Sequence, residues 1–156
     1  MRYDGFPIDA EVVTDWPLPA QALPPGITLT PGVAASSDRW RELWRRADAY
    51  VMPTRHEAFG IVYEEAAASG IPAIGSDINA VPEIIQDGAT GCLVPPGDRA
   101  ALARAPRALL ESADLRNRMG IAARERVSQR ASLPVYAARL NAIIDNVVKN
   151  DVRQPA

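Results

Sequence analysis

Two glutamates near the middle of the chain are spaced so that they can share one ligand. Glu57 and Glu65 are separated by seven residues, and Gly60 lies between them, within residues 54–74, TRHEAFGIVYEEAAASGIPAI. This stretch follows one short apolar run and ends in a second, the strand, loop, helix, strand order of a parallel α/β sheet. In such sheets, ligands bind beyond the carboxyl ends of the strands, where a loop turns into a helix. We therefore expect both carboxylates at a ligand site.

The groups around Gly60 suit a phosphate, and the glutamates suit hydroxyls. If a helix begins near Gly60, the free N–H groups of residues 61–63 point into the crevice, and the helix dipole adds about 0.3–1 kcal/mol for an anion. Glycine also allows a ligand to approach the backbone closely. Carboxylates repel phosphate but accept hydrogen bonds from sugar hydroxyls, at about 1.5–3 kcal/mol per charged bond. A phosphate flanked by two hydroxyl-bearing groups describes a nucleotide sugar.

The same residues carry a family resemblance. The stretch HEAFGIVYEEAAASGIPAIGSD resembles the signature of retaining GT-B glycosyltransferases (glycosyl transferases group 1). The similarity continues through AVPEII at residues 80–85 and DGATGCLVPPGD at residues 87–98, so that it covers residues 47–98 strongly. Motif, order and spacing agree over some fifty residues, which makes the resemblance specific.

The resemblance implies the C-terminal, donor-binding domain of such an enzyme, with a Rossmann-like parallel sheet flanked by helices. It implies transfer of a sugar from a nucleotide-sugar donor with retention, in glycan biosynthesis, and without a metal or cofactor. By position, Glu57 would contact the donor sugar and is the catalytic candidate, and Glu65 would hold the ribose hydroxyls. Phe59, Gly60 and Ile61 would contact sugar and phosphate through their backbone.

The resemblance also implies parts that this sequence lacks. Relatives have a first domain for the acceptor, and their opening strand and a glycine-rich segment with a basic pair should lie upstream of Ile8. Here Arg2 is alone in that region, and the first lysine is Lys149. We therefore expect a partial domain, weak or inactive alone, that needs an acceptor-binding domain or partner chain. A sheet that lacks a strand has an edge with unpaired backbone groups, which can pair with a second copy of the chain to form a homodimer.

Two other functions remain open. The chain is alternatively a non-catalytic nucleotide-sugar-binding or assembly module that acts with a partner chain. A related sugar-nucleotide epimerase is a third reading, but it would need other catalytic residues that the sequence does not show.

Composition excludes several classes of protein. The chain has 156 residues, a net charge of −2 and a pI near 5.4, so nothing marks a nucleic-acid or anionic-membrane surface. No apolar run reaches the length of a membrane helix, and the start has no signal-peptide core. One cysteine excludes an internal disulfide and fits the cytoplasm. We expect a single domain over residues 1–150 and a frayed tail over residues 151–156.

Periodicity and turn residues predict the elements. The expected strands are residues 8–14, 27–30, 49–52, 73–76 and 92–94. The expected helices are residues 38–47, 61–69, 82–85, 98–111, 114–130 and 133–148. Residues 1–7 are expected to be a poorly anchored lead-in, 49–52 the central strand covered on both faces, and 149–156 frayed. Pro106 should kink or interrupt its helix.

Several side chains have a structural and a functional interpretation. Trp40 and Trp44 recur at helical spacing, so packing on the sheet is favoured over stacking on a nucleobase. Glu83 either contacts ligand or simply favours a helix N-terminus. His56 is interpreted as a loop residue, because enzymes of this resemblance take no general base from that position. Cys92 is interpreted as a small apolar residue of a strand, and Asn79 as a turn residue that tolerates left-handed geometry.

Overall fold

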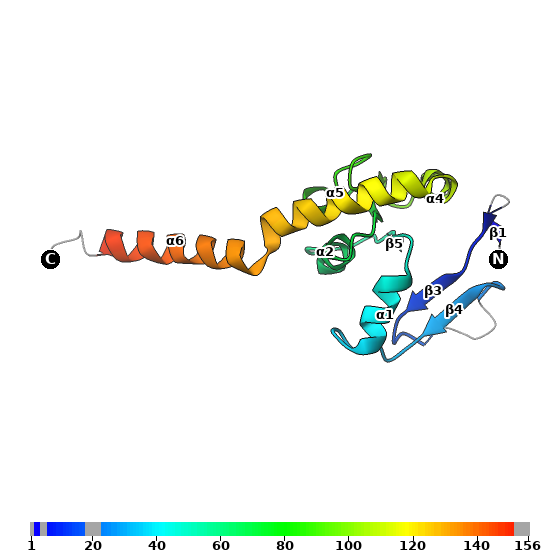
Figure 1. Ribbon diagram of the computed structural model, residues 1–156, viewed down its shortest axis with the longest axis horizontal. Coiled ribbons are helices and arrows are strands. Elements are labelled where there is room, and N and C mark those ends of the chain that lie inside the picture. Colours follow the sequence, from blue (N-terminus) through cyan, green and yellow to red (C-terminus); the bar gives the residue numbers. More distant parts are fainter. Residues whose placement is uncertain (1, 4–5, 18–22, 152–156) are drawn as a thin grey trace.

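The computed structural model of the chain describes residues 2–3, 6–17 and 23–151 (Figure 1). Its strands are β1 (Arg2–Tyr3), β2 (Phe6–Pro7), β3 (Ala10–Val13), β4 (Ile27–Thr30), β5 (Tyr50–Met52), β6 (Ala73–Ser76) and β7 (Gly91–Val94). Its helices are α1 (Asp38–Arg46), α2 (Ile61–Ala68), α3 (Val81–Ile84), α4 (Arg99–Glu111), α5 (Ala113–Ala131) and α6 (Leu133–Asp151). Parallel strands flanked by helices confirm the predicted α/β fold class.

The main sheet has three parallel strands in the order β5-β6-β7. All four residues of β6 are buried, as expected for a strand covered on both faces. The prediction that residues 49–52 form the central strand is wrong, because β5 lies at the edge of this sheet and Val51 is 45% exposed. The free edge of β5 has no neighbouring strand among the described residues.

The first part of the chain forms separate strand pairs. β3 and β4 pair in parallel, and β1 and β2 pair antiparallel within the predicted lead-in. Thr30 Oγ1 and Arg39 Nη2 both donate to Glu11 Oε1, at 2.5 and 2.8 Å, which fixes α1 against the β3-β4 pair. The parallel strands therefore form two separate sheets in the described part of the chain.

Two apolar clusters lie on opposite faces of β6, since successive side chains of a strand alternate. One cluster contains Tyr63, Ala73, Val81 and Ile85. The other contains Ile74, Val94, Leu109 and Met119. Both clusters thus hold β6 between α2 and α3 on one side and α4 and α5 on the other.

The tryptophans of α1 belong to an aromatic chain that leads into this core. The ring centroids of Trp40 and Trp44 are 6.0 Å apart, those of Trp44 and Tyr50 are 5.3 Å apart, and those of Tyr50 and Tyr63 are 5.7 Å apart. All three pairs are edge to face. Such pairs stabilise a fold by about 0.5–1.5 kcal/mol beyond burial alone. These contacts favour the packing interpretation of Trp40 and Trp44.

The last three helices differ from the sequence-based expectation in two places. α4 is continuous through Pro106, where a kink or an interruption was expected, so the helix is not interrupted there. α6 continues to Asp151, past the residue 149 at which fraying was expected, while residues 152–156 lie outside the described part. α6 projects away from the sheets, so that its last described turn lies far from β1 (Figure 1). Of the helices described, none is both long enough and apolar enough to cross a membrane.

Candidate functional site

The candidate site lies where the loops after β5 and β6 leave the sheet. Both loops start at the same edge, because the two strands are parallel and Met52 is in register with Gly75. Thr54 organises the first loop: its hydroxyl donates to the carbonyl of His56 at 2.6 Å and accepts from the amide of His56 at 3.2 Å. A short hydrogen-bonded turn at residues 54–56 therefore precedes Glu57.

Gly60 is the N-cap of α2 and has a left-handed conformation, with φ +88°. A Cβ at this position would lie 2.7 Å from Cδ2 of Tyr63, so glycine is required for both conformation and space. We expected three free amides at this helix start, but the amide of Tyr63 donates to the carbonyl of Gly60 at 2.9 Å. The amides of Ile61 and Val62 have no acceptor among the described residues, so two donors rather than three remain for an anion.

Glu57 and Glu65 approach the same neighbourhood from the loop and from the helix. Glu57 Oε1 accepts from the amide of Phe59 at 3.3 Å, which turns the carboxylate back toward the start of α2. Glu65 is one helical turn after Ile61, on the same face of α2. Burial raises the pKa of Tyr50 above its ordinary value, and the nearby Tyr63, Glu65 and Glu57 raise it further, in that order. Both carboxylates thus lie within electrostatic reach of one partly buried phenol.

The apolar members of the predicted site face outward. Phe59 is 50% exposed and Ile61 is 63% exposed, one on each side of the buried Gly60. Their backbone is accessible at the helix start, as main-chain contacts with a ligand would require. The five residues predicted from the sequence therefore form one continuous junction between loop 53–60 and α2.

The side chains of two residues in this neighbourhood were not predicted to take part. Tyr63 is buried, and its hydroxyl donates to the carbonyl of Met52 at 2.6 Å, which holds α2 on the end of β5. Burial, and then the charge of Glu57, raise the pKa of Tyr63 to about 12. Asn79, after β6, has φ +47° and donates from Nδ2 to the carbonyl of Glu57 at 2.6 Å. Its left-handed conformation was expected from its residue type, but no sequence signal pointed to the contact 22 residues away.

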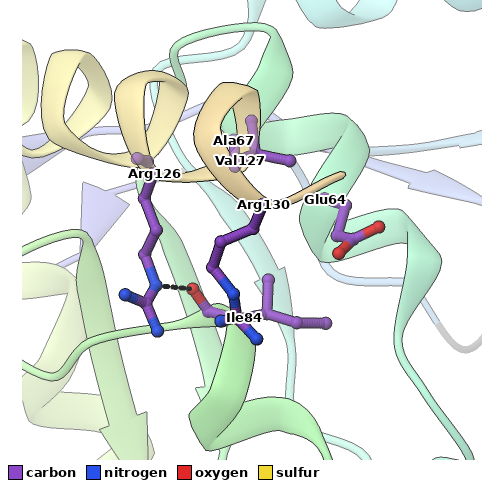
Figure 2. A pocket seen from close by; sticks show the side chains of 7 residues that line it. Glu64, Ala67, Ile84, Arg126, Val127 and Arg130 are labelled. Carbon is purple, nitrogen blue, oxygen red and sulfur yellow. Dashed lines mark hydrogen bonds between the residues drawn. The ribbon is translucent and has the colours of Figure 1, made fainter. Parts of the chain in front are cut away.

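α3 follows Asn79, and two arginines of α5 form hydrogen bonds with its backbone. Arg126 donates from Nε to the carbonyl of Ile84 at 3.3 Å (Figure 2). Its Nη2 donates to the carbonyl of Glu83 at 2.8 Å, and Arg130 also donates to that carbonyl. The carboxylate of Glu83 lies 3.8 Å from Arg130, so its neighbour is an arginine of α5. This contact favours the structural interpretation of Glu83.

A shallow hollow lies behind α3, and it uses different residues from the predicted site. Its lining residues are Glu64, Ala67, Ile84, Ala123, Arg126, Val127 and Arg130 (Figure 2).

Neither a reactive thiol nor a metal site accompanies the junction among the described residues. Burial and then the charge of Asp87 raise the pKa of Cys92, which keeps it a thiol and agrees with its interpretation as a small apolar residue. Across the ranges described, no group of three or more histidine, cysteine, aspartate or glutamate residues is arranged to hold a metal ion.

Comparison with known proteins identifies the family. Residues 26–126, which include the whole candidate site, match the family Glycosyl transferases group 1. The chain belongs to this family. It is 42% identical over 104 residues to phosphatidyl-myo-inositol mannosyltransferase of Mycobacterium leprae, which covers 66% of this chain and 28% of that protein. It is 33% identical over 114 residues to N-acetyl-alpha-D-glucosaminyl L-malate synthase of Bacillus anthracis, covering 73% of this chain and 30% of the relative.

Solved structures of related proteins share the fold. Sucrose-phosphate synthase of Thermosynechococcus elongatus aligns over 80% of this chain and 31% of its own, with a TM-score of 0.73 and 26% identity. Anabaena HepE in complex with UDP aligns over 89% of this chain and 41% of its own, with a TM-score of 0.78 and 18% identity, which supports the fold alone. This group 1 glycosyltransferase chain therefore spans less than a third of the length of the curated relatives named above.

Proposed function

We propose that the chain is the donor-binding part of a retaining glycosyltransferase that moves a sugar from a nucleotide-sugar donor to an acceptor. The main support is the loop–helix junction, where the two free amides of Ile61 and Val62 lie in one stretch with the carboxylates of Glu57 and Glu65. The family supports sugar transfer in general, and the site chemistry supports the nucleotide sugar as the donor.

Each group at the junction has a role in this proposal. The diphosphate lies against the amides of Ile61 and Val62, where the positive end of the α2 dipole stabilises negative charge. Glu65 accepts hydrogen bonds from the ribose hydroxyls, and Glu57 does so from the sugar. As the nucleoside diphosphate leaves, negative charge grows at the amides, which stabilise it, and the Glu57 carboxylate offsets the positive charge that develops on the sugar. None of these roles uses a metal ion, so a chelator should leave donor affinity unchanged.

The acceptor is bound by another part of the protein or by a partner chain in this proposal. The chain matches only 28% and 30% of the length of the two curated relatives. The uncovered edge of β5, with Val51 exposed, offers a place for a further strand or for a second copy. We therefore expect the isolated chain to bind donor and to turn it over weakly or not at all.

Calorimetric titration of the 156-residue chain tests the proposal. The panel contains uridine, guanosine and adenosine diphosphates and their sugars, starting with UDP-glucose, because a HepE structure holds that compound. Glu65→Ala should weaken both nucleotide and nucleotide sugar by at least about tenfold, since a charged hydrogen bond is lost. Glu57→Gln should weaken only the nucleotide sugar. Glu64→Ala removes the same charge from the adjacent position of α2 and should leave the affinity unchanged.

The outcomes separate the proposal from its alternatives. A folded chain that binds no member of the panel contradicts a working donor pocket. Donor binding that never leads to transfer, even with an acceptor-binding partner supplied, would instead favour the non-catalytic module.

A further inference from the structure

Asn79 connects the two loops that build the candidate site. It lies in the loop after β6, and its Nδ2 donates to the backbone carbonyl of Glu57, in the loop after β5, at 2.6 Å. The two loops leave neighbouring parallel strands at the same edge of the sheet. A single side-chain amide therefore couples residues that are 22 positions apart in the sequence.

This bond reaches Glu57 at a point where little else holds it. The carboxylate of Glu57 accepts from the amide of Phe59 at 3.3 Å, which is a contact within its own loop. Thr54 and His56 also bond to each other within that loop. Within the described part of the chain, Asn79 is the one residue outside loop 53–60 that forms a hydrogen bond with Glu57. Among the described hydrogen bonds, the link between Glu57 and the rest of the fold is thus the bond from Asn79.

The residue type at position 79 satisfies two requirements at once. The backbone has φ +47°, which asparagine adopts more readily than most residues. The side chain must also donate a hydrogen bond, which asparagine does through its amide. Glycine would meet the first requirement better but has no donor, and aspartate has the shape but, when ionised, only accepts.

We propose that Asn79 is a positioning residue that holds Glu57 in the orientation needed to contact the donor sugar. The inference rests on the proposed function for the role of Glu57. It predicts a selective defect: Asn79→Gly loosens Glu57 but leaves Glu65 and the amides of Ile61 and Val62 in place. Affinity for a nucleotide sugar falls about tenfold, while affinity for the nucleoside diphosphate alone does not change.

Calorimetry on the full chain tests this selectivity with UDP and UDP-glucose. Asn79→Gly should weaken UDP-glucose and spare UDP. Asn79→Asp, which cannot donate when ionised, should also weaken UDP-glucose. Ser36→Gly is the matched control, because Ser36 is the other described non-glycine residue with positive φ, +63°, and it lies before α1, outside the two loops of the site. If Asn79 serves only the turn, Asn79→Gly binds UDP-glucose as well as the unmodified chain does, and the inference is overturned.

A second measurement needs no ligand. Amide hydrogen exchange of residues 56–59 should be faster in Asn79→Gly than in the unmodified chain and in Ser36→Gly, because the tie to Glu57 is lost. Unchanged exchange at these amides contradicts the inference even if no nucleotide binds. Failure of the unmodified chain to bind any nucleotide, with faster exchange in the variant, would count against the proposed function while supporting the tie between Asn79 and Glu57.

Discussion

At the scale of single residues, Gly60, Tyr63 and Glu57 form one contact group at the start of α2. The ring of Tyr63 fills the space where a Cβ of residue 60 would lie, and that same Cβ would be 3.6 Å from Cγ of Glu57. The hydroxyl of Tyr63 holds the end of β5. A side chain at residue 60 would therefore overlap the ring of Tyr63 and lie against the side chain of Glu57.

Gly60→Ala should therefore destabilise the fold more than an alanine at an open left-handed glycine does. Left-handed backbone costs a non-glycine residue about 1–2 kcal/mol, and overlap with the buried Tyr63 ring adds about 1–3 kcal/mol. Gly88→Ala is the control, because Gly88 has φ +73° and open space around it. Urea unfolding of both variants measures the difference, and equal losses would show that the ring contact contributes nothing.

Tyr63 should make the stability of the chain depend on pH in the alkaline range. Its pKa is raised from 10.0 to about 12, so the folded state favours the neutral phenol. The stability that this group contributes is complete below pH 10 and is lost as the pH rises from 10 to about 12. The pKa of Tyr50 is raised in the same direction, so part of the dependence remains without Tyr63. Urea unfolding at a series of pH values should show a shallower decline for Tyr63→Phe, and identical declines would contradict this assignment.

At the scale of elements, the site depends on how α2 packs against the sheet and, at its far end, against α5. α2 carries the free amides and Glu65, and its far end turns at Gly70, whose carbonyl faces Gly120 of α5. An added Cβ at Gly120 would overlap the carbonyl oxygen of Gly70. Because residue 120 has no side chain, α5 can pack directly against the end of α2.

Gly120→Ala should destabilise the chain, although alanine is the better helix former. Intrinsic preference favours alanine by about 0.8–1 kcal/mol, but overlap with backbone that cannot move freely costs about 1–3 kcal/mol or more. Asn117→Ala, at an exposed position of α5, should change the free energy of unfolding by less than about 0.5 kcal/mol. A stabilised Gly120→Ala variant would mean that α2 and α5 are not in contact there.

Local signals predicted the elements of the site well, and non-local pairings explain the errors. β4 and β6 occupy the predicted residues, because their apolar runs and flanking turns are local features. The edge position of β5 and the separation of the two parallel sheets depend on which strands pair, which no local pattern encodes. The same holds for the bond from Asn79 to Glu57, whose partners are close only because β5 and β6 are neighbours.

At the scale of the whole molecule, the chain exposes an unusually large surface. Its accessible area is 10588 Å², against about 7,700 Å² expected for a compact monomer of this mass. α6 contributes much of this exposed area, because it projects from the rest of the molecule (Figure 1). Val135 is partly buried, but seven other large apolar side chains of α6 are exposed: Leu133, Tyr136, Leu140, Ile143, Ile144, Val147 and Val148. This helix therefore adds little buried surface to the core.

Removal of residues 133–156 should change the stability of the remaining chain by less than about 1 kcal/mol, because so little of α6 is buried against the rest. Urea unfolding of the shortened chain beside the full chain measures the change. A loss of several kcal/mol would contradict this description and would mean that α6 packs on the body in solution.

Donor binding is the claim on which the account depends most directly. The first measurement is the calorimetric titration of the 156-residue chain and of Glu65→Ala with the nucleotide panel, with Glu64→Ala as the matched control. One nucleotide and its sugar should bind the unmodified chain and Glu64→Ala equally, and both should bind Glu65→Ala at least about tenfold more weakly. Equal affinity in all three proteins, or no binding by a folded unmodified chain, would contradict donor binding at this site.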